Sequence, residues 1–506
     1  MKANYSNVAF IIGGVSVSTE LLCYQLLQPF AGNSFFIWLI TLSFTLIGML
    51  LGYYSTYNKN TTVESLPKYI CIALFFYFAS TYITKQIIYK FYTLDYRLLS
   101  AIIALFFVIP VSFYLTKITP ILVSVSKKNE EQKNVGNLFL LSTIGAATFI
   151  LVTGVVLIPY FGFLTSKFLL SVCLLICVFV CYKISKSKSK LYIYLGMLIV
   201  FFQLLEVIVS KKQMVANSTI EYASSSILGQ MQVINNGKAK MLVVNSMLQS
   251  TDNINEDFST FPYVHFISYV SSLYPEKSNI LLGGVGSGSL IKEFIKLKLN
   301  VTAVDIDKRM FDVAEENFNL NRELYDFYVD DFRHFLNKTK NKYDVVVLDI
   351  SIGESQPAHL YTVESFSKIK DCLTENGIVL IHYVADTKSK SFCSLYNTIL
   401  ESGMQSKVYS TNEYSNSDLV LVVTKNNLNK YLNANQFRKN DRHVEALKIA
   451  NFYNKPKSDF NCANAIIFTD NNPVLDILHQ EFVIETRTNT LKNVPTLKVN
   501  NLIGYE

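Results

Sequence analysis

The chain has 506 residues, of which half are hydrophobic, and a formal net charge of +7 that is carried mostly by lysine. This length is too great for one typical domain, and so modest a charge gives no reason to expect a nucleic-acid partner. Long apolar runs are concentrated in residues 1–213, whereas residues 214–506 alternate apolar and polar positions as a soluble domain does. We therefore expect a multi-pass α-helical membrane domain followed by a soluble half.

Seven apolar runs in the first half each approach the ~20 residues that cross the hydrocarbon core of a bilayer. A buried helix of a soluble protein would explain one such run but not seven in succession. Two runs, 98–120 and 191–209, are the weakest, so six or seven membrane helices are expected. The first run lacks a basic flank and a small-residue cleavage site, so no cleavable signal peptide is expected. The predicted spans are 7–28, 33–55, 69–90, 98–120, 137–160, 163–184 and 191–209.

Two carboxylates, Glu20 and Glu206, lie inside these apolar runs. A charge is costly at such a position. One interpretation is a transport or proton path. We favour the other, in which each carboxylate bonds to a neighbouring helix or, for Glu206, lies near a helix end.

Five of the eight cysteines also fall within the apolar runs, where they act as small hydrophobic residues. Cys372, Cys393 and Cys462 are scattered through the soluble half without a CxxC or metal-ligand spacing. The six histidines form no HxxxH or HxH cluster. We therefore expect neither a disulfide framework nor a metal site.

The soluble half begins with short predicted strands over residues 214–276. Asn235-Asn236-Gly237 separates two alternating runs, 228–234 and 240–244, and this pattern is a hairpin signal. We expect a β-hairpin region that lies on the substrate side of the following domain.

From residue 279 onward, predicted strands alternate with predicted helices, which is typical of a parallel sheet covered on both faces. We expect an α/β Rossmann-like domain over 277–430 and a C-terminal extension, 431–506, packed on it. Ligands of such domains bind beyond the carboxyl ends of the strands. Predicted strands lie near 279–283, 301–305, 325–329, 344–349, 377–383 and 418–424, and predicted helices near 288–298, 308–318, 363–373 and 389–402.

A glycine loop follows the first of these strands and contains Gly284, Gly286 and Gly288. Such a loop lets the backbone turn tightly and approach a ligand without obstruction by Cβ atoms. About 20 residues later Asp305 ends the next strand, where a carboxylate binds ribose hydroxyls in nucleotide folds. The pattern predicts a nucleoside-type cofactor site rather than a glycine turn in an ordinary α/β domain.

Further carboxylates follow the third and fourth strands, at Asp331 and Asp349. Either residue is able to cap a helix, and we expect Asp331 to cap one that begins at Phe332. Because parallel strands end at one edge of a sheet, Asp305, Asp331 and Asp349 are predicted to face one crevice.

Several short motifs together carry a family resemblance. In the soluble half they lie at 283–289, 304–307, 331, 349–360 and 469–473, and in the helical half at 20–22, 28–34, 50–54, 142–145 and 157–162. Residues 214–425 resemble spermidine synthases, which are aminopropyltransferases on a class I methyltransferase-type fold. The whole chain resembles bacterial membrane proteins that fuse such a domain behind a multi-pass segment.

The resemblance implies a role for each matching position. The implied cofactor-binding residues are Gly284, Gly286, Gly288, Asp305 and Asp331, the implied catalytic residues are Asp349 and Glu354, and the implied substrate-binding residues are Gln249, Tyr263 and His359. Asp349 would orient the attacking amine and accept its proton. For His359, a helix-capping role is an equal alternative.

Two positions depart from the family pattern. The acid that pairs with the ammonium of decarboxylated S-adenosylmethionine is replaced by Gly286, and the second catalytic acid by Ile352, for which Glu354 is a candidate substitute. Loss of the loop acid also removes a repulsion against the carboxylate of intact S-adenosylmethionine. The sequence is therefore compatible with either decarboxylated or intact S-adenosylmethionine as the donor.

We expect aminopropyl transfer from decarboxylated S-adenosylmethionine to a diamine or polyamine. Methyl transfer from S-adenosylmethionine and a non-catalytic polyamine or nucleoside sensor or transporter are the alternatives. The expected partners are a small amine acceptor and the lipid bilayer, without nucleic acid or metal, and a homodimer is left open.

Two indications conflict on which side of the membrane the soluble half lies. Lysines concentrate near 127–133 and at 183–190, and such clusters are typical of cytoplasmic loops. With seven spans these loops would lie opposite the soluble half. Because a nucleoside cofactor is cytosolic, we expect a cytoplasmic catalytic domain and leave the number of spans open.

Overall fold

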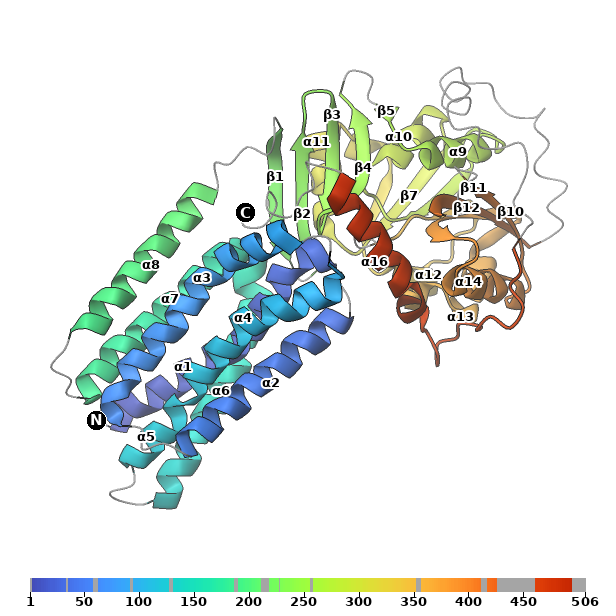
Figure 1. Cartoon of the computed structure of the whole chain (residues 1–506). Coiled ribbons are helices and arrows are strands. Elements are labelled where there is room, and N and C mark those ends of the chain that lie inside the picture. The colour runs from blue at the N-terminus through green and yellow to red at the C-terminus, as the bar shows by residue number, and fades with distance from the viewer. Residues whose placement is uncertain are drawn as a thin grey trace.

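A computed structural model describes most of the chain (Figure 1). It shows an elongated bundle of helices joined to an α/β half that contains two sheets. The described residues are 2–32, 35–57, 62–91, 94–126, 131–185, 190–210, 218–226, 228–254, 258–351, 356–410, 416–425 and 460–493.

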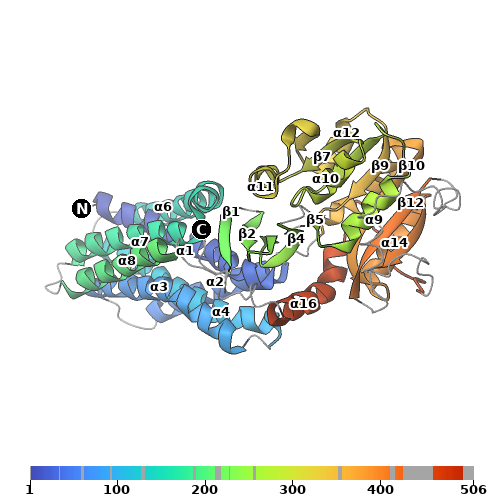
Figure 2. The same ribbon diagram turned by 90° about the horizontal axis from the view of Figure 1, so that it is seen from above.

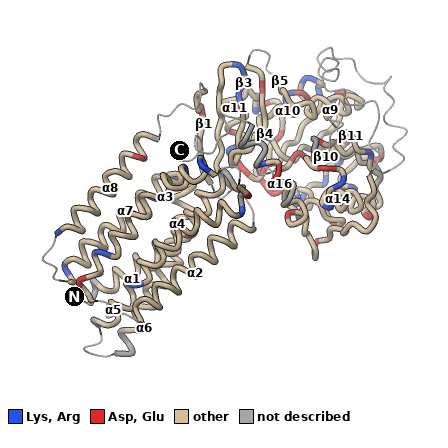
Figure 3. The backbone as a smooth tube through the Cα atoms, in the orientation of Figure 1, with Lys and Arg blue, Asp and Glu red and all other residues tan. Residues whose placement is uncertain are grey.

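The bundle is built from the apolar runs of the first half. Within the described residues, six helical segments are long and apolar enough to cross a membrane. The bundle helices are α1 (Lys2–Ala31), α2 (Phe35–Tyr57), α3 (Leu66–Phe91), α4 (Tyr96–Thr116), α5 (Ile118–Ser126), α6 (Glu131–Val152), α7 (Ile158–Ser185) and α8 (Leu191–Ser210). Charged residues are sparse along these helices and frequent in the α/β half (Figure 3).

One of the six segments, Val135–Ser185, is too long for a single crossing. Its 51 residues would extend about 76 Å as a straight helix, whereas the hydrocarbon core is ~30 Å thick. Gly162 interrupts the helical geometry with φ 75° and ψ −179°. The break lies near the middle of the segment, between the predicted runs 137–160 and 163–184.

Close helix packing and one ion pair connect the bundle. A side chain at Gly13 would overlap Ser142, and one at Gly145 would overlap Phe10, so these glycines allow α1 and α6 to approach closely. Glu206 of α8 lies 3.0 Å from Lys167 of α7. Glu206 therefore bonds to a neighbouring helix, as favoured from the sequence.

A small antiparallel sheet begins the α/β half. Its strands follow chain order: β1 (Thr219–Ser226), β2 (Gly229–Asn235), β3 (Ala239–Val244), β4 (Met247–Asn253) and β5 (Phe258–Ser259). The predicted hairpin is the β2–β3 pair, in which Asn235 faces Lys240. The side chain of Asn236 accepts hydrogen bonds from the backbone N–H groups of Lys238 and Ala239, which closes the turn.

A seven-stranded sheet forms the centre of the soluble domain. Its order is β11-β12-β10-β9-β6-β7-β8, and the strands are β6 (Asn279–Gly283), β7 (Asn300–Asp305), β8 (Asp326–Val329), β9 (Tyr343–Leu348), β10 (Leu373–Asp386), β11 (Gln405–Ser410) and β12 (Asn416–Thr424). The strands from β6 to β10 pair in parallel, but β12 is antiparallel to both β10 and β11. The fold is Rossmann-like and of the methyltransferase type, and the predicted all-parallel sheet is corrected to a mixed one.

Helices cover both faces of this sheet. One face packs against α9 (Pro262–Ser271), α10 (Ser289–Lys296) and α11 (Lys308–Phe318), and the other against α12 (Phe332–Lys338), α13 (Val363–Cys372) and α14 (Lys390–Glu401). The central strands are buried on both faces, which explains why their sequences are continuous apolar runs. Asp331 caps α12 by accepting a hydrogen bond of 3.0 Å from the backbone N–H of His334, as predicted.

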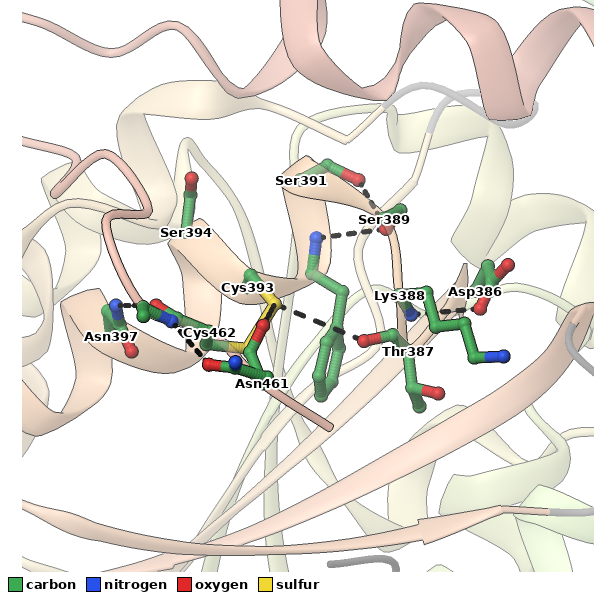
Figure 4. The surroundings of a disulfide bond; sticks show 12 residues. Asp386, Thr387, Lys388, Ser389, Ser391, Cys393, Ser394, Asn397, Asn461 and Cys462 are labelled. Carbon is green, nitrogen blue, oxygen red and sulfur yellow. Dashed lines mark hydrogen bonds between the residues drawn. A yellow bond between two sulfur atoms is a disulfide. The ribbon is translucent and has the colours of Figure 1, made fainter. Parts of the chain in front are cut away.

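The last described segment returns to the bundle and the sheet. A disulfide bond joins Cys393 of α14 to Cys462 (Figure 4), although the cysteine spacing gave no reason to expect one. The following helix, α16 (Leu475–Asn493), lies between the bundle and the larger sheet (Figures 1 and 2). Buried Arg487 of α16 donates a hydrogen bond of 2.7 Å to the backbone carbonyl of Asn245.

Candidate functional site

A cavity of about 490 Å³ lies at the carboxyl ends of the central strands. β6 pairs with β7 on one side and β9 on the other, so the strand order reverses there. Ligands of open α/β sheets bind at such a reversal. The predicted residues that line the cavity are Gln249, Tyr263, Gly284, Gly286, Asp305, Asp331, Asp349 and His359.

Part of the glycine loop, including Gly284 and Gly286, lines the cavity. Gly284 has a positive φ of 87°, and a side chain there would collide with the backbone carbonyl of Asp349. Gly286, at φ 55°, also lines the cavity. Gly288 instead caps α10 and packs closely against Leu320. The loop therefore presents backbone rather than side chains to a ligand.

Asp305 lies beside this loop at the end of β7. Its carboxylate accepts hydrogen bonds from the backbone N–H groups of Val285, at 3.0 Å, and Asp307, at 2.9 Å. Burial raises the pKa of Asp305 to about 6, although these two bonds oppose the shift. The carboxylate is therefore fixed in place next to the glycine loop and is ionised at neutral pH.

Asp331 lies at the end of β8 and is held by His359. The His359 Nε2 atom is 2.9 Å from the Asp331 carboxylate. Burial raises the pKa of Asp331, but bonds from the His334 backbone and from His359 outweigh it, so the net pKa is lowered. His359 thus contacts a predicted cofactor residue.

Asp349 follows β9 and both of its oxygens are occupied. Oδ2 accepts a hydrogen bond of 3.0 Å from the Tyr263 hydroxyl, and Oδ1 lies 2.8 Å from Nδ1 of His382. The rings of Tyr263 and His382 are stacked, with centroids 3.6 Å apart and an interplanar angle of 6°. The two rings therefore fix the carboxylate from α9 and β10 together.

His382 is positively charged in this arrangement at neutral pH. Burial lowers its pKa, but the charge and hydrogen bond of Asp349 and the nearby Asp418 outweigh burial and raise the pKa to about 9. Asp418 of β12 lies 3.7 Å from the His382 Nε2 atom. Burial and Asp349 together hold the pKa of Tyr263 well above its usual value, so its hydroxyl is a donor.

The remaining predicted residues differ in how the structure places them. Gln249 of β4 accepts a hydrogen bond of 3.0 Å from Ser351, so the small sheet reaches the segment after β9. Glu354 lies outside the described residues. In the described parts of the chain, no cluster of three His, Cys, Asp or Glu residues is arranged to hold a metal ion.

Several cavity residues were not predicted from the sequence. His382 and Asp418 lie on β10 and β12, and His479, Phe482 and Thr486 come from α16. His382 had a usable signal, because it is a titratable residue near the end of a buried strand, like the three predicted aspartates. The α16 residues had none, since no motif connects them to the sheet.

Comparisons with known proteins find relatives of the α/β half. Residues 261–433 match the family described as Spermine/spermidine synthase domain. A polyamine aminopropyltransferase of Saccharolobus solfataricus is 28% identical over 182 residues, which cover 32% of this chain and 56% of that protein. Polyamine aminopropyltransferase 2 of Aquifex aeolicus is 25% identical over 415 residues, covering 78% of this chain and 82% of that protein.

Among solved structures, spermidine synthase from Thermotoga maritima is 16% identical with a TM-score of 0.35, and the match covers 53% of this chain and 87% of that chain. The match to the Saccharolobus relative spans little more than half the length of that protein. The matched residues nevertheless contain the whole strand-end region of the cavity from Tyr263 to Asp418. Residues 261–433 therefore resemble a spermine/spermidine synthase domain, and the chain is similar to polyamine aminopropyltransferases over a longer stretch.

Proposed function

We propose that this protein transfers an aminopropyl group from decarboxylated S-adenosylmethionine to an amine of a diamine or polyamine. In this proposal the helical bundle spans a lipid bilayer and anchors the catalytic domain to it. In this proposal the glycine loop, Asp305 and Asp331 bind the donor. Asp349, Tyr263, Gln249 and the predicted Glu354 act on the acceptor side.

The reaction is a displacement at the aminopropyl carbon bonded to sulfur. The lone pair of the acceptor nitrogen forms the new C–N bond, and the C–S pair stays on sulfur, which leaves as neutral methylthioadenosine. The attacking nitrogen must be a free amine, and the proton it loses passes to a carboxylate. Holding the two reactants in line supplies much of the remaining rate acceleration.

The observation that carries the proposal is the fixed carboxylate of Asp349 opposite the donor-side acids. The carboxylate is 20% exposed towards the cavity, while Tyr263 and His382 prevent it from rotating. An amine held at this carboxylate would face the loop on which the sulfonium lies. Both substrates then meet in one cavity of about 490 Å³.

Methyl transfer from intact S-adenosylmethionine is the second candidate, and Gly286 favours it. The nearest group to a side chain at this position would be the Ser250 hydroxyl, at 3.1 Å. The loop therefore presents no acid to the methionine part of the donor at this position. An intact donor carboxylate would meet no repulsion from residue 286.

Product analysis with the purified full-length protein distinguishes these reactions. Each donor is incubated with putrescine, spermidine and longer polyamines. Methylthioadenosine is expected, whereas S-adenosylhomocysteine would establish methyl transfer instead. If neither product forms although the donor binds, the domain is a sensor rather than an enzyme.

A further inference from the structure

The two ends of the helical bundle differ in charge. The residues between α1 and α2, those between α3 and α4, and the break at Gly162 include no lysine or arginine. Three other connections, between α2 and α3, α5 and α6, and α7 and α8, include six lysines. These are Lys59, Lys127, Lys128, Lys186, Lys188 and Lys190. The described helix ends that flank these lysines in sequence, at Tyr57, Ser126, Ser185 and Leu191, lie at one end of the bundle, which we call the lysine-rich end.

The soluble half is attached to the opposite end of the bundle. α8 begins after Lys190 at the lysine-rich end and finishes at Ser210, and β1, the next described strand, packs against α7. Figure 1 shows the start of α1 and helix α5 far from both sheets. We call the opposite end the sheet end.

The sheet end has fewer cations, and two of them pair with neighbouring acids. Arg97 pairs with Asp95 at 2.9 Å, and Lys167 pairs with Glu206 at 3.0 Å. The other cations in the last turns at this end or just after α8 in the sequence are Lys85, Lys90, Lys211 and Lys212. The lysine-rich end adds Lys2, Lys68, Lys133 and Lys183 in its flanking turns. Lysine and arginine in short loops favour the cytoplasmic side, and acids have little influence.

The disulfide bond gives an independent indication of compartment. Cys393 and Cys462 are 69 residues apart and join α14 to the segment that leads to α16 (Figure 4). Asn397 reinforces the junction with a hydrogen bond of 2.8 Å to the Cys462 carbonyl. Disulfide bonds persist in oxidising compartments and are rare in the cytosol. The bond lies in the soluble half, and the cysteines of the bundle are free thiols.

From these two observations we infer that the lysine-rich end faces the cytoplasm and that the soluble half lies on the opposite, oxidising side of the membrane. This orientation reverses the cytoplasmic placement expected from the nucleoside donor. It also deepens the proposed function, on which this part rests. The cavity takes both its sulfonium donor and its amine acceptor from the extracytoplasmic side.

Cysteine labelling of the full-length chain in a bacterial host tests the orientation. Asp326→Cys on β8 and Lys190→Cys at the lysine-rich end both replace exposed side chains, and the parent chain gives the background. A membrane-impermeant maleimide should label Asp326→Cys on intact spheroplasts and Lys190→Cys only after lysis. The reverse pattern would overturn the inference.

Thiol counting tests the compartment without relying on surface access. After denaturation without reductant, two of the eight cysteines should resist alkylation in the native chain. Cys393→Ser should leave no protected thiol, whereas the matched Cys372→Ser should still leave two. Alkylation of all eight native cysteines would contradict an oxidising location.

An activity measurement on the same spheroplasts tests the source of the substrates. Decarboxylated S-adenosylmethionine and spermidine are supplied outside, with the Asp349→Asn chain as control. Methylthioadenosine should form without lysis, and activity that appears only after lysis would refute extracytoplasmic use. If lysed cells are also inactive, the proposed transfer fails, and the labelling still decides the orientation.

Discussion

The donor side and the acceptor side of the cavity are built in different ways. On the donor side, the glycine loop and Asp305 belong to one strand–loop–helix–strand segment of 27 residues, from Asn279 to Asp305. On the acceptor side, Asp349 is held by Tyr263 and His382, which lie 86 and 33 residues away in sequence. Local backbone geometry thus forms one side, and tertiary packing of separate elements forms the other. Substitutions should therefore separate donor binding from turnover.

The largest effect is expected from Asp349→Asn. Turnover should fall by about 10²–10⁴-fold, because the amide cannot accept the proton of the acceptor amine. Affinity for methylthioadenosine should stay within about twofold of the native chain. Initial rates and calorimetric titration measure the two quantities, with the exposed Asp326→Asn as control. A loss of methylthioadenosine affinity would move Asp349 to the donor side.

His382→Gln should change how stability depends on pH. The pKa of His382 is raised to about 9 in the folded protein, against ~6.5 when unfolded. Its contribution, on the order of 3 kcal/mol, is fully present below about pH 6.5 and is lost as the pH rises through about 9. The difference in melting temperature between native and variant chains should therefore shrink from pH 6.5 to 9.5.

His479→Gln is the matched control for this measurement. Burial lowers the pKa of His479 to about 4, so the side chain stays neutral throughout that pH range. The difference in melting temperature between His479→Gln and the native chain should be constant between pH 6.5 and 9.5. A constant difference for His382→Gln as well would show that His382 does not pair with Asp349 as an imidazolium.

Asp305→Ala should weaken the donor side alone. Loss of hydrogen bonds to a charged group costs about 1.5–3 kcal/mol, which corresponds to a ~10–100-fold weaker affinity for methylthioadenosine. Because the pKa of Asp305 is about 6, native affinity should fall between pH 7 and pH 5 as the carboxylate is protonated. The variant should lack this pH dependence in calorimetric titrations. Unchanged affinity would exclude Asp305 from the donor site.

The smallest effect is expected from Arg333→Ala. Arg333 of α12 makes a two-pronged contact with Asp470, at 2.5 and 2.7 Å, and joins the C-terminal segment to the donor side. Both side chains are partly exposed, so the stability change should be roughly 1 kcal/mol or less. Thermal unfolding measures this change. The comparison is Arg322→Ala, which removes an ion pair of Arg322 with Asp312 of α11. A change of several kcal/mol would indicate that the segment depends on this pair.

The sequence predicted the parts of the molecule that depend on local patterns. The apolar runs gave the bundle helices, and the strands from β6 to β10 lie within a few residues of their predicted positions. The predicted direction of β12 was wrong, because an apolar run does not specify whether the strand pairs in parallel or antiparallel with the neighbouring strand. His382 and Asp418 were missed because each lies in a strand without a motif. The disulfide was missed because its cysteines are far apart in sequence.

The position of α16 has a practical consequence for dissecting this protein. His479, Phe482 and Thr486 line the cavity, yet they lie beyond the matched domain, which stops at residue 433. A fragment that ends at the domain boundary would lack the α16 side of the cavity, and the remaining cavity residues would be exposed to solvent. Any shortened version intended for ligand screening must therefore extend to Asn493, where α16 ends.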